Sequence, residues 1–163
     1  MKRFLLPLVF LASLALALSL AGCGDSAETA ESALSRLTPA QLDERMGDIC
    51  QKHTDKKFTE IGRWEKKHGL PRSAYEDVPD AQYERELMQI QIPDVRETIR
   101  ELERKLRPPK SEEKTFKAFL AALEYGIEFS EKDPSWYPTG YTEPFSKARA
   151  LAWKLGTAYC GQA

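Results

Sequence analysis

Apolar residues recur three and four positions apart along most of the chain, from Thr38 almost to the C-terminus, and alternating β-branched runs are nearly absent. This period is that of amphipathic helices with one face turned toward a core. Stretches rich in Pro, Gly and charged residues divide the pattern into four segments. The sequence therefore predicts an all-α fold, an antiparallel four-helix bundle with kinked or split helices.

The ends of the first two helices carry recognisable signals. Thr38 reads as an N-cap with Pro39 at the first helical position, and Gly69 followed by Pro71 reads as a stop. The second segment contains Pro93, which must remove one backbone hydrogen bond. We therefore expect the second segment to be kinked at this proline or split into two helices.

Two further helices complete the pattern. Ser111 is a good N-cap for the third helix, and Thr142-Glu143-Pro144 opens the last one. The inward-facing positions expected in the four helices are Leu42, Met46, Ile49, Cys50, His53, Ile61 and Trp64; Tyr83, Leu87, Ile90, Val95, Ile99, Leu102 and Leu106; Phe116, Phe119, Leu120, Leu123 and Ile127; and Phe145, Ala148, Leu151, Ala152 and Leu155.

A different pattern precedes the helices. Lys2 and Arg3 are followed by an uncharged apolar run from Phe4 to Leu20. A basic start, an apolar middle and a small-residue exit are typical of a secretory signal peptide. A membrane span is the alternative, because it needs about 20 apolar residues and this run is close to that length.

The exit from the apolar run resembles the lipobox of bacterial lipoproteins, in the residues Leu20-Ala21-Gly22-Cys23. The resemblance implies that a diacylglyceryl group is added to the Cys23 thiol and that the chain is cut just before this residue. The protein would then be held by lipid on the extracytoplasmic side of a bacterial membrane without spanning it. The expected organisation is a cleaved signal peptide at 1–22, a lipidated cysteine and flexible tether at 23–37, and the helical bundle at 38–163.

The charge balance argues against nucleic acid as a partner. The chain of 163 residues carries a formal charge of −1. Cleavage before Cys23 leaves 141 residues and removes Lys2 and Arg3 but no acid, so the charge becomes −3. A mildly acidic protein without a basic cluster does not fit nucleic-acid binding.

Cys50 and Cys160 are the cysteines that remain beside Cys23. In an exported protein a disulfide between them is the expected state, and it would join the first helix to the end of the last. A metal site is the alternative, with Cys50, His53, Cys160 and His68 as ligands, because zinc needs three or four. Haem held by histidine and methionine is a further alternative, but we expect no metal and no cofactor.

Neither the charged residues nor the residue types common in catalysis strongly indicate a functional site. The chain has two histidines and no Gly-x-Ser-x-Gly motif, so we expect no enzymatic activity. Arg96, Arg100 and Arg104 stand one helical turn apart and could meet lipid headgroups or phosphates. The acidic residues between them, Glu97, Glu101 and Glu103, favour a solvated face instead.

Aromatic residues gather in and before a turn-rich stretch, at Tyr125, Phe129, Trp136, Tyr137 and Tyr141. Aromatic side chains that the core does not need can form a binding surface for sugars, lipids or another protein. The alternative is that this loop folds over the open end of the bundle and its aromatic rings plug the core. These five residues are the candidate binding residues.

The later two-thirds of the chain also resembles uncharacterised, disulfide-clasped helical lipoproteins of high-GC Gram-positive bacteria. The residues that carry the resemblance are Cys50, Leu102, Leu106, Pro108, Pro109, Phe116, Phe119, Leu120, Leu155, Gly156 and Cys160. The resemblance implies no activity. We expect a lipid-anchored cell-envelope protein that binds a partner protein or envelope component, or alternatively a carrier of a small hydrophobic ligand held in the bundle.

Overall fold

The fold is known from a computed structural model that describes residues 35–70, 79–139, 143–157 and 160. Residues 1–22 and most of the expected tether lie outside this part of the chain. The described elements are α1 (Pro39–His68), α2 (Asp80–Glu86), the π-helical segment η3 (Leu87–Gln91), α3 (Ile92–Lys105), α4 (Glu113–Lys132), α5 (Trp136–Thr139) and α6 (Ser146–Lys154). They include no strand, and the predicted all-α bundle is confirmed.

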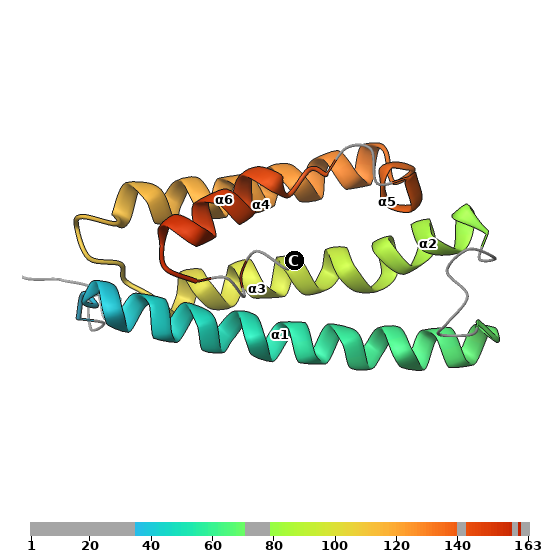
Figure 1. The fold of residues 1–163 in the computed structure, drawn as a ribbon, viewed down its shortest axis with the longest axis horizontal. Helices are drawn as coiled ribbons and strands as arrows, with labels where there is room; N and C mark the ends of the chain where they lie inside the picture. The colour runs from blue at the N-terminus through green and yellow to red at the C-terminus, as the bar shows by residue number, and fades with distance from the viewer. Residues whose placement is uncertain (1–34, 71–78, 140–142, 158–159, 161–163) are drawn as a thin grey trace, which may run out of the picture.

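The helices run up and down along one long axis (Figure 1). α1 packs against α3, α3 packs against α4, and α4 in turn packs against α6. The short α5 covers the end of the bundle at which α2 begins, and contacts α2. None of the described helices is both long and apolar enough to span a bilayer.

The predicted ends of α1 are confirmed. The Thr38 side chain accepts a hydrogen bond from the backbone N–H of Gln41, whose side chain in turn accepts from the Thr38 N–H. Such a reciprocal pair satisfies two backbone donors that the first turn leaves open. At the other end Gly69 has a φ of 69°, a left-handed conformation that glycine adopts without steric cost.

Pro93 neither breaks nor ends the second helical segment. Helix continues without interruption from Asp80 to Lys105, and the turn before the proline is π-helical, with the Ile92 N–H donating to the carbonyl of Leu87. A π-helical turn has a wider backbone, which accommodates a residue that lacks an N–H and crowds the preceding turn. Residues 80–105 therefore form one continuous helix, in which the backbone hydrogen bonds change from the α to the π pattern at η3.

Two predicted helix starts are wrong. Ser111 is not the N-cap of α4; the backbone N–H of Glu112 donates to the Pro109 carbonyl in a turn, and the helix begins only at Glu113. The last helix begins at Ser146, after a turn in which the Ser146 N–H donates to the Glu143 carbonyl. In both places a proline-containing turn occupies the residues that the sequence pattern assigned to the first helical turn.

The predicted inner faces form one core. Every inward position predicted in α4 is buried, as are the predicted apolar positions of α3 and most of those in α1 and α6. The largest fully buried side chains include Phe119, Leu42, Met46, Leu87, Leu102 and Leu123. Four residues that were predicted to be inward-facing are only partly buried: Ile61, Trp64, Tyr83 and Leu151.

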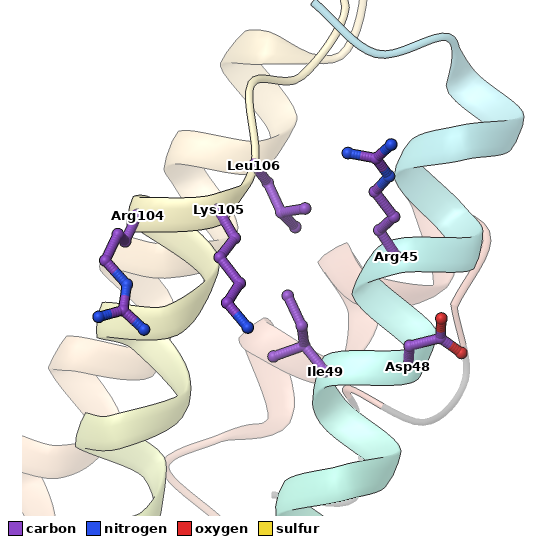
Figure 2. Close-up of a pocket in the computed structure, with 6 residues that line it drawn as sticks. All are labelled: Arg45, Asp48, Ile49, Arg104, Lys105 and Leu106. Atoms are coloured by element: carbon purple, nitrogen blue, oxygen red, sulfur yellow. The ribbon is translucent and has the colours of Figure 1, made fainter. Parts of the chain in front are cut away.

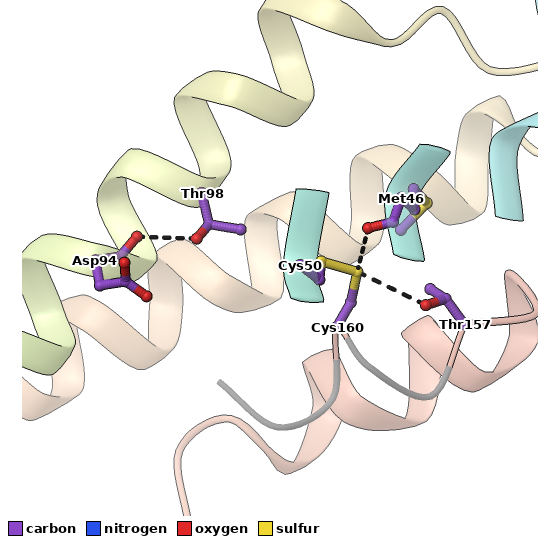
Figure 3. The surroundings of a disulfide bond; sticks show 6 residues. All are labelled: Met46, Cys50, Asp94, Thr98, Thr157 and Cys160. Atoms are coloured by element: carbon purple, nitrogen blue, oxygen red, sulfur yellow. Dashed lines mark hydrogen bonds between the residues drawn. A yellow bond between two sulfur atoms is a disulfide. The ribbon is translucent and has the colours of Figure 1, made fainter. Parts of the chain in front are cut away.

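The predicted disulfide is present between Cys50 in α1 and Cys160 beyond α6 (Figure 3). Their Cα atoms are 5.0 Å apart and 110 positions separate them in the sequence. The Cys160 sulfur lies 3.4 Å from the Met46 carbonyl oxygen and accepts a hydrogen bond from the Thr157 hydroxyl. The bond fastens the end of the chain to the middle of α1.

The contact between α4 and α6 depends on Gly126. A Cβ at this position would lie too close to the nearest atom of the buried Phe145 ring, so the two would overlap. We expect Gly126→Ala to lower the free energy of unfolding by about 1–3 kcal/mol in urea titrations, because overpacking outweighs the better helix propensity of alanine.

Gly47→Ala is the matched control for this prediction. Gly47 also lies inside a helix, and its added Cβ would have Thr157 Oγ1 as its nearest neighbour, at an ordinary 3.8 Å. This variant should gain about 0.5–1 kcal/mol. Equal gains in both variants would show that α4 and α6 do not approach as closely as described.

Candidate functional site

Helix α5, which carries two of the five candidate binding residues, covers one end of the bundle. Trp136 and Tyr137 lie in α5 and pack against the core. The Trp136 indole N–H donates to Ser130 Oγ over 3.1 Å, and the Tyr137 hydroxyl donates to Glu86 Oε1 over 3.1 Å. Because both polar atoms bond within the protein, these two side chains fit a plug for the core better than a binding surface.

The other candidate binding residues are placed differently. Tyr125 is 58% exposed on α4, and its ring centroid lies 6.3 Å from that of the half-buried Phe129. Tyr141 lies outside the described residues. The structure thus brings the candidates together as two pairs, Trp136 with Tyr137 and Tyr125 with Phe129, of which the second is the more accessible.

A buried charged network lies between α1 and α3. His53 is only 2% exposed; its Nδ1 lies 3.1 Å from Asp94 Oδ1 and its Nε2 lies 2.8 Å from Glu101 Oε2. A neutral imidazole has one N–H, so hydrogen bonds to two carboxyl groups require one further proton, on the ring or on a carboxyl. The network therefore holds a charged histidine or a protonated acid inside the bundle.

The two acids experience opposite environments. Hydrogen bonds from Lys105, Lys52 and His53 hold the pKa of Glu101 well below its ordinary value. Both lysine contacts measure 2.6 Å. Burial instead raises the pKa of Asp94, and its hydrogen bond to His53 only partly opposes this shift. Asp94 is thus the acid with the greater tendency to hold a proton.

Lys57 adds a buried cation one turn beyond His53. Burial lowers its pKa, against the opposing influence of Asp94 and Glu86. His53, Lys57 and Asp94 line a cavity of about 20 Å³, together with the disulfide and other residues. A cavity of this size suits about one water molecule. This cavity is too small for a hydrophobic ligand.

The metal site considered from the sequence is not formed. Cys50 and Cys160 are bonded to each other. His68 lies near the end of α1, about 22 Å along the helix from His53 at 1.5 Å per residue. A different set can offer ligands instead: one atom each from His53, Asp94 and Glu97 lies within 4.8 Å of the others.

A surface groove runs between the start of α1 and the end of α3 (Figure 2). It has a volume of about 350 Å³ and is lined by Arg45, Asp48, Ile49, Arg104, Lys105 and Leu106. Ile49, Lys105 and Leu106 point into the space between the helices, Arg45 lies opposite Leu106, and Arg104 and Asp48 stand at the outer edges. Lys105 is paired with Glu101, so Arg45 and Arg104 against Asp48 give the groove a positive rim.

The sequence pattern did not single out Asp94, Glu101 and Lys57. The prediction that Glu101 lies on a solvated face is wrong, because this residue is only 7% exposed. The spacing of the two acids could have indicated that they share a helical face. Asp94 and Glu101 are seven residues apart, which places them on one helical face beside Val95 and Leu102. Charged side chains at such positions are usually exposed, so spacing alone does not identify them as buried.

Comparison with known proteins assigns no family. No protein-family model matches this chain, and neither a curated protein nor a solved structure is detectably similar to it.

Proposed function

We propose that this chain is a lipid-anchored protein of the bacterial cell envelope whose helical bundle binds an envelope component without catalysing a reaction. The residues that support the anchor are Leu20-Ala21-Gly22-Cys23, which match the lipobox, after an uncharged apolar run. Acyl chains on Cys23 would hold the mature protein to the membrane, since each buried methylene adds about 0.8 kcal/mol.

The observation that carries the binding proposal is where the groove lies relative to the anchor. The Leu37 N–H donates to the Arg107 carbonyl, and Arg36 donates to the Pro108 carbonyl, so the chain before α1 packs against the end of α3. The groove lies at this same end of the bundle. Because Arg36 and Leu37 pack against the end of α3, only the part of the predicted tether before them could be flexible. As a coil that part would span roughly 20 Å, so the groove would lie close to the bilayer surface.

The chemistry of the groove fits the anionic headgroups of membrane lipids. Arg45 and Arg104 supply positive charge beside the ion pair of Lys105 with Glu101, and Ile49 and Leu106 supply an apolar floor. Each cation close to an anionic bilayer contributes about 1 kcal/mol. That attraction disappears beyond a Debye length of about 8–10 Å, so only the tethered end of the bundle benefits.

The test uses the lipidated protein in proteoliposomes. With anionic lipid present, hydrogen exchange at the start of α1 and the end of α3 should slow relative to purely zwitterionic vesicles. The double variant Arg45→Glu/Arg104→Glu should lose this protection, because reversal removes two attractions and introduces repulsion.

The matched control reverses two exposed arginines at the opposite end of the bundle, Arg63→Glu and Arg85→Glu. This control should keep the protection seen in the unaltered protein. Equal exchange in anionic and zwitterionic vesicles, or equal losses in both double variants, would overturn the assignment of the groove.

A further inference from the structure

We propose that His53, Asp94 and Glu97 bind a divalent transition-metal ion between α1 and α3. Each residue offers one ligand atom, and these atoms lie within 4.8 Å of one another. His53 comes from the middle of α1, whereas Asp94 and Glu97 lie one turn apart at the start of α3. The site would join two neighbouring helices of the bundle.

The distance between the two buried ligands suits a shared ion. His53 Nδ1 lies 3.1 Å from Asp94 Oδ1. Two atoms that each bind a metal at about 2.0–2.2 Å lie roughly 3–3.5 Å apart at tetrahedral or octahedral angles. An ion could therefore replace the hydrogen bond between these atoms with little movement of either helix.

Glu101 supplies the outer partner that a metal-binding histidine commonly has. Its Oε2 lies 2.8 Å from His53 Nε2, on the ring edge opposite the proposed ion. A carboxylate in this position accepts a hydrogen bond from Nε2–H, fixes the orientation of the ring and leaves the Nδ1 lone pair for the metal. The same carboxylate is held in place by Lys52 and Lys105.

The local backbone and the exposure of Glu97 also suit a site. Asp94 directly follows Pro93 and lies three positions after the end of η3. Such π-helical turns occur frequently at functional sites. Glu97 is exposed, so an ion can reach the buried pair from solvent on its side.

Two cations compete with the ion. Lys56 forms an exposed ion pair with Glu97, and the buried Lys57 interacts electrostatically with Asp94. An exposed ion pair contributes at most about 1 kcal/mol, so an entering ion can displace Lys56. Lys57 remains beside Asp94 and would limit the affinity.

The donor set indicates the class of metal. One imidazole and two carboxylates form a site of intermediate hardness, suited to Zn²⁺, Co²⁺ or Mn²⁺ and without the thiolates that softer ions prefer. Cys50 and Cys160 are committed to their disulfide and supply no thiolate. Three protein ligands leave at least one position for water.

The experiment titrates Co²⁺ into the tag-free full chain in detergent, with the disulfide intact, and follows visible absorption. We expect saturable binding of one ion per chain, and Zn²⁺ should compete for it. Glu97→Gln should weaken binding at least about tenfold, and its exposed position should leave the thermal transition almost unchanged.

Glu103→Gln is the matched control, an exposed acid on the same helix outside the cluster. It should bind Co²⁺ as tightly as the unaltered protein. The proposal is overturned if Co²⁺ absorption does not saturate at millimolar concentration, or if Glu97→Gln binds as tightly as Glu103→Gln.

Discussion

Replacing both bridged cysteines with alanine is expected to lower the free energy of unfolding by about 4–5 kcal/mol. The bond between Cys50 and Cys160 closes a loop with a sequence separation of 110. A cross-link across so long a segment removes many conformations from the unfolded chain, and this loss of entropy stabilises the folded state. Urea titration of the Cys50→Ala/Cys160→Ala variant beside the oxidised protein measures the difference.

Reduction of the unaltered protein is the control for the cysteine variant. Dithiothreitol should produce nearly the same loss, because alanine and the thiol have similar small volumes in a buried position. A difference below about 1 kcal/mol between the oxidised protein and the double variant would contradict the stabilising role of the bridge.

Removing the His53 imidazole should have an effect of similar size. We expect His53→Ala to cost about 3–5 kcal/mol, because Asp94 and Glu101 lose their shared partner while they remain buried. The cavity left by the ring adds to the loss. Chemical denaturation at neutral pH measures the change.

The ion pair between Lys56 and Glu97 gives a matched control for His53→Ala. It joins the same two helices, but its side chains are 40% and 51% exposed. Lys56→Ala should therefore cost less than about 1 kcal/mol. If the two variants lose the same stability, burial does not strengthen the His53 network as we infer.

The helices were predictable because their signals are local. Apolar spacing gave four segments and most of the core, and the capping residues Thr38 and Gly69 gave both ends of α1. The starts of α4 and α6 were misplaced because turns that follow Pro109 and contain Pro144 compete with the first helical turn. The π-helical turn before Pro93 was not predicted, because a proline inside a helix more commonly produces a kink or a break.

The polar interior was much harder to predict. Charged residues on a helix are normally exposed, so Lys57, Asp94 and Glu101 were not distinguished from their solvated neighbours. Their burial depends on the alignment of α1 with α3, which brings His53 between the two acids. The spacing of apolar residues in one helix does not reveal which side chains of another helix will face it.

The aromatic residues show a related limit. Composition drew attention to the aromatic residues between Tyr125 and Tyr141, but it could not distinguish a binding surface from a plug for the core. The hydrogen bonds of Trp136 and Tyr137 with Ser130 and Glu86 favour the plug for these two residues. Tyr125 and Phe129 are more accessible, and we still predict that they are binding residues.

Intact mass spectrometry of the protein extracted from membranes of its own host tests the proposed envelope anchor most directly. The proposal predicts a chain that begins at Cys23, carries acyl groups on that residue and lacks two hydrogens because of the Cys50–Cys160 bond. The mass of an unprocessed chain without acyl groups would contradict it.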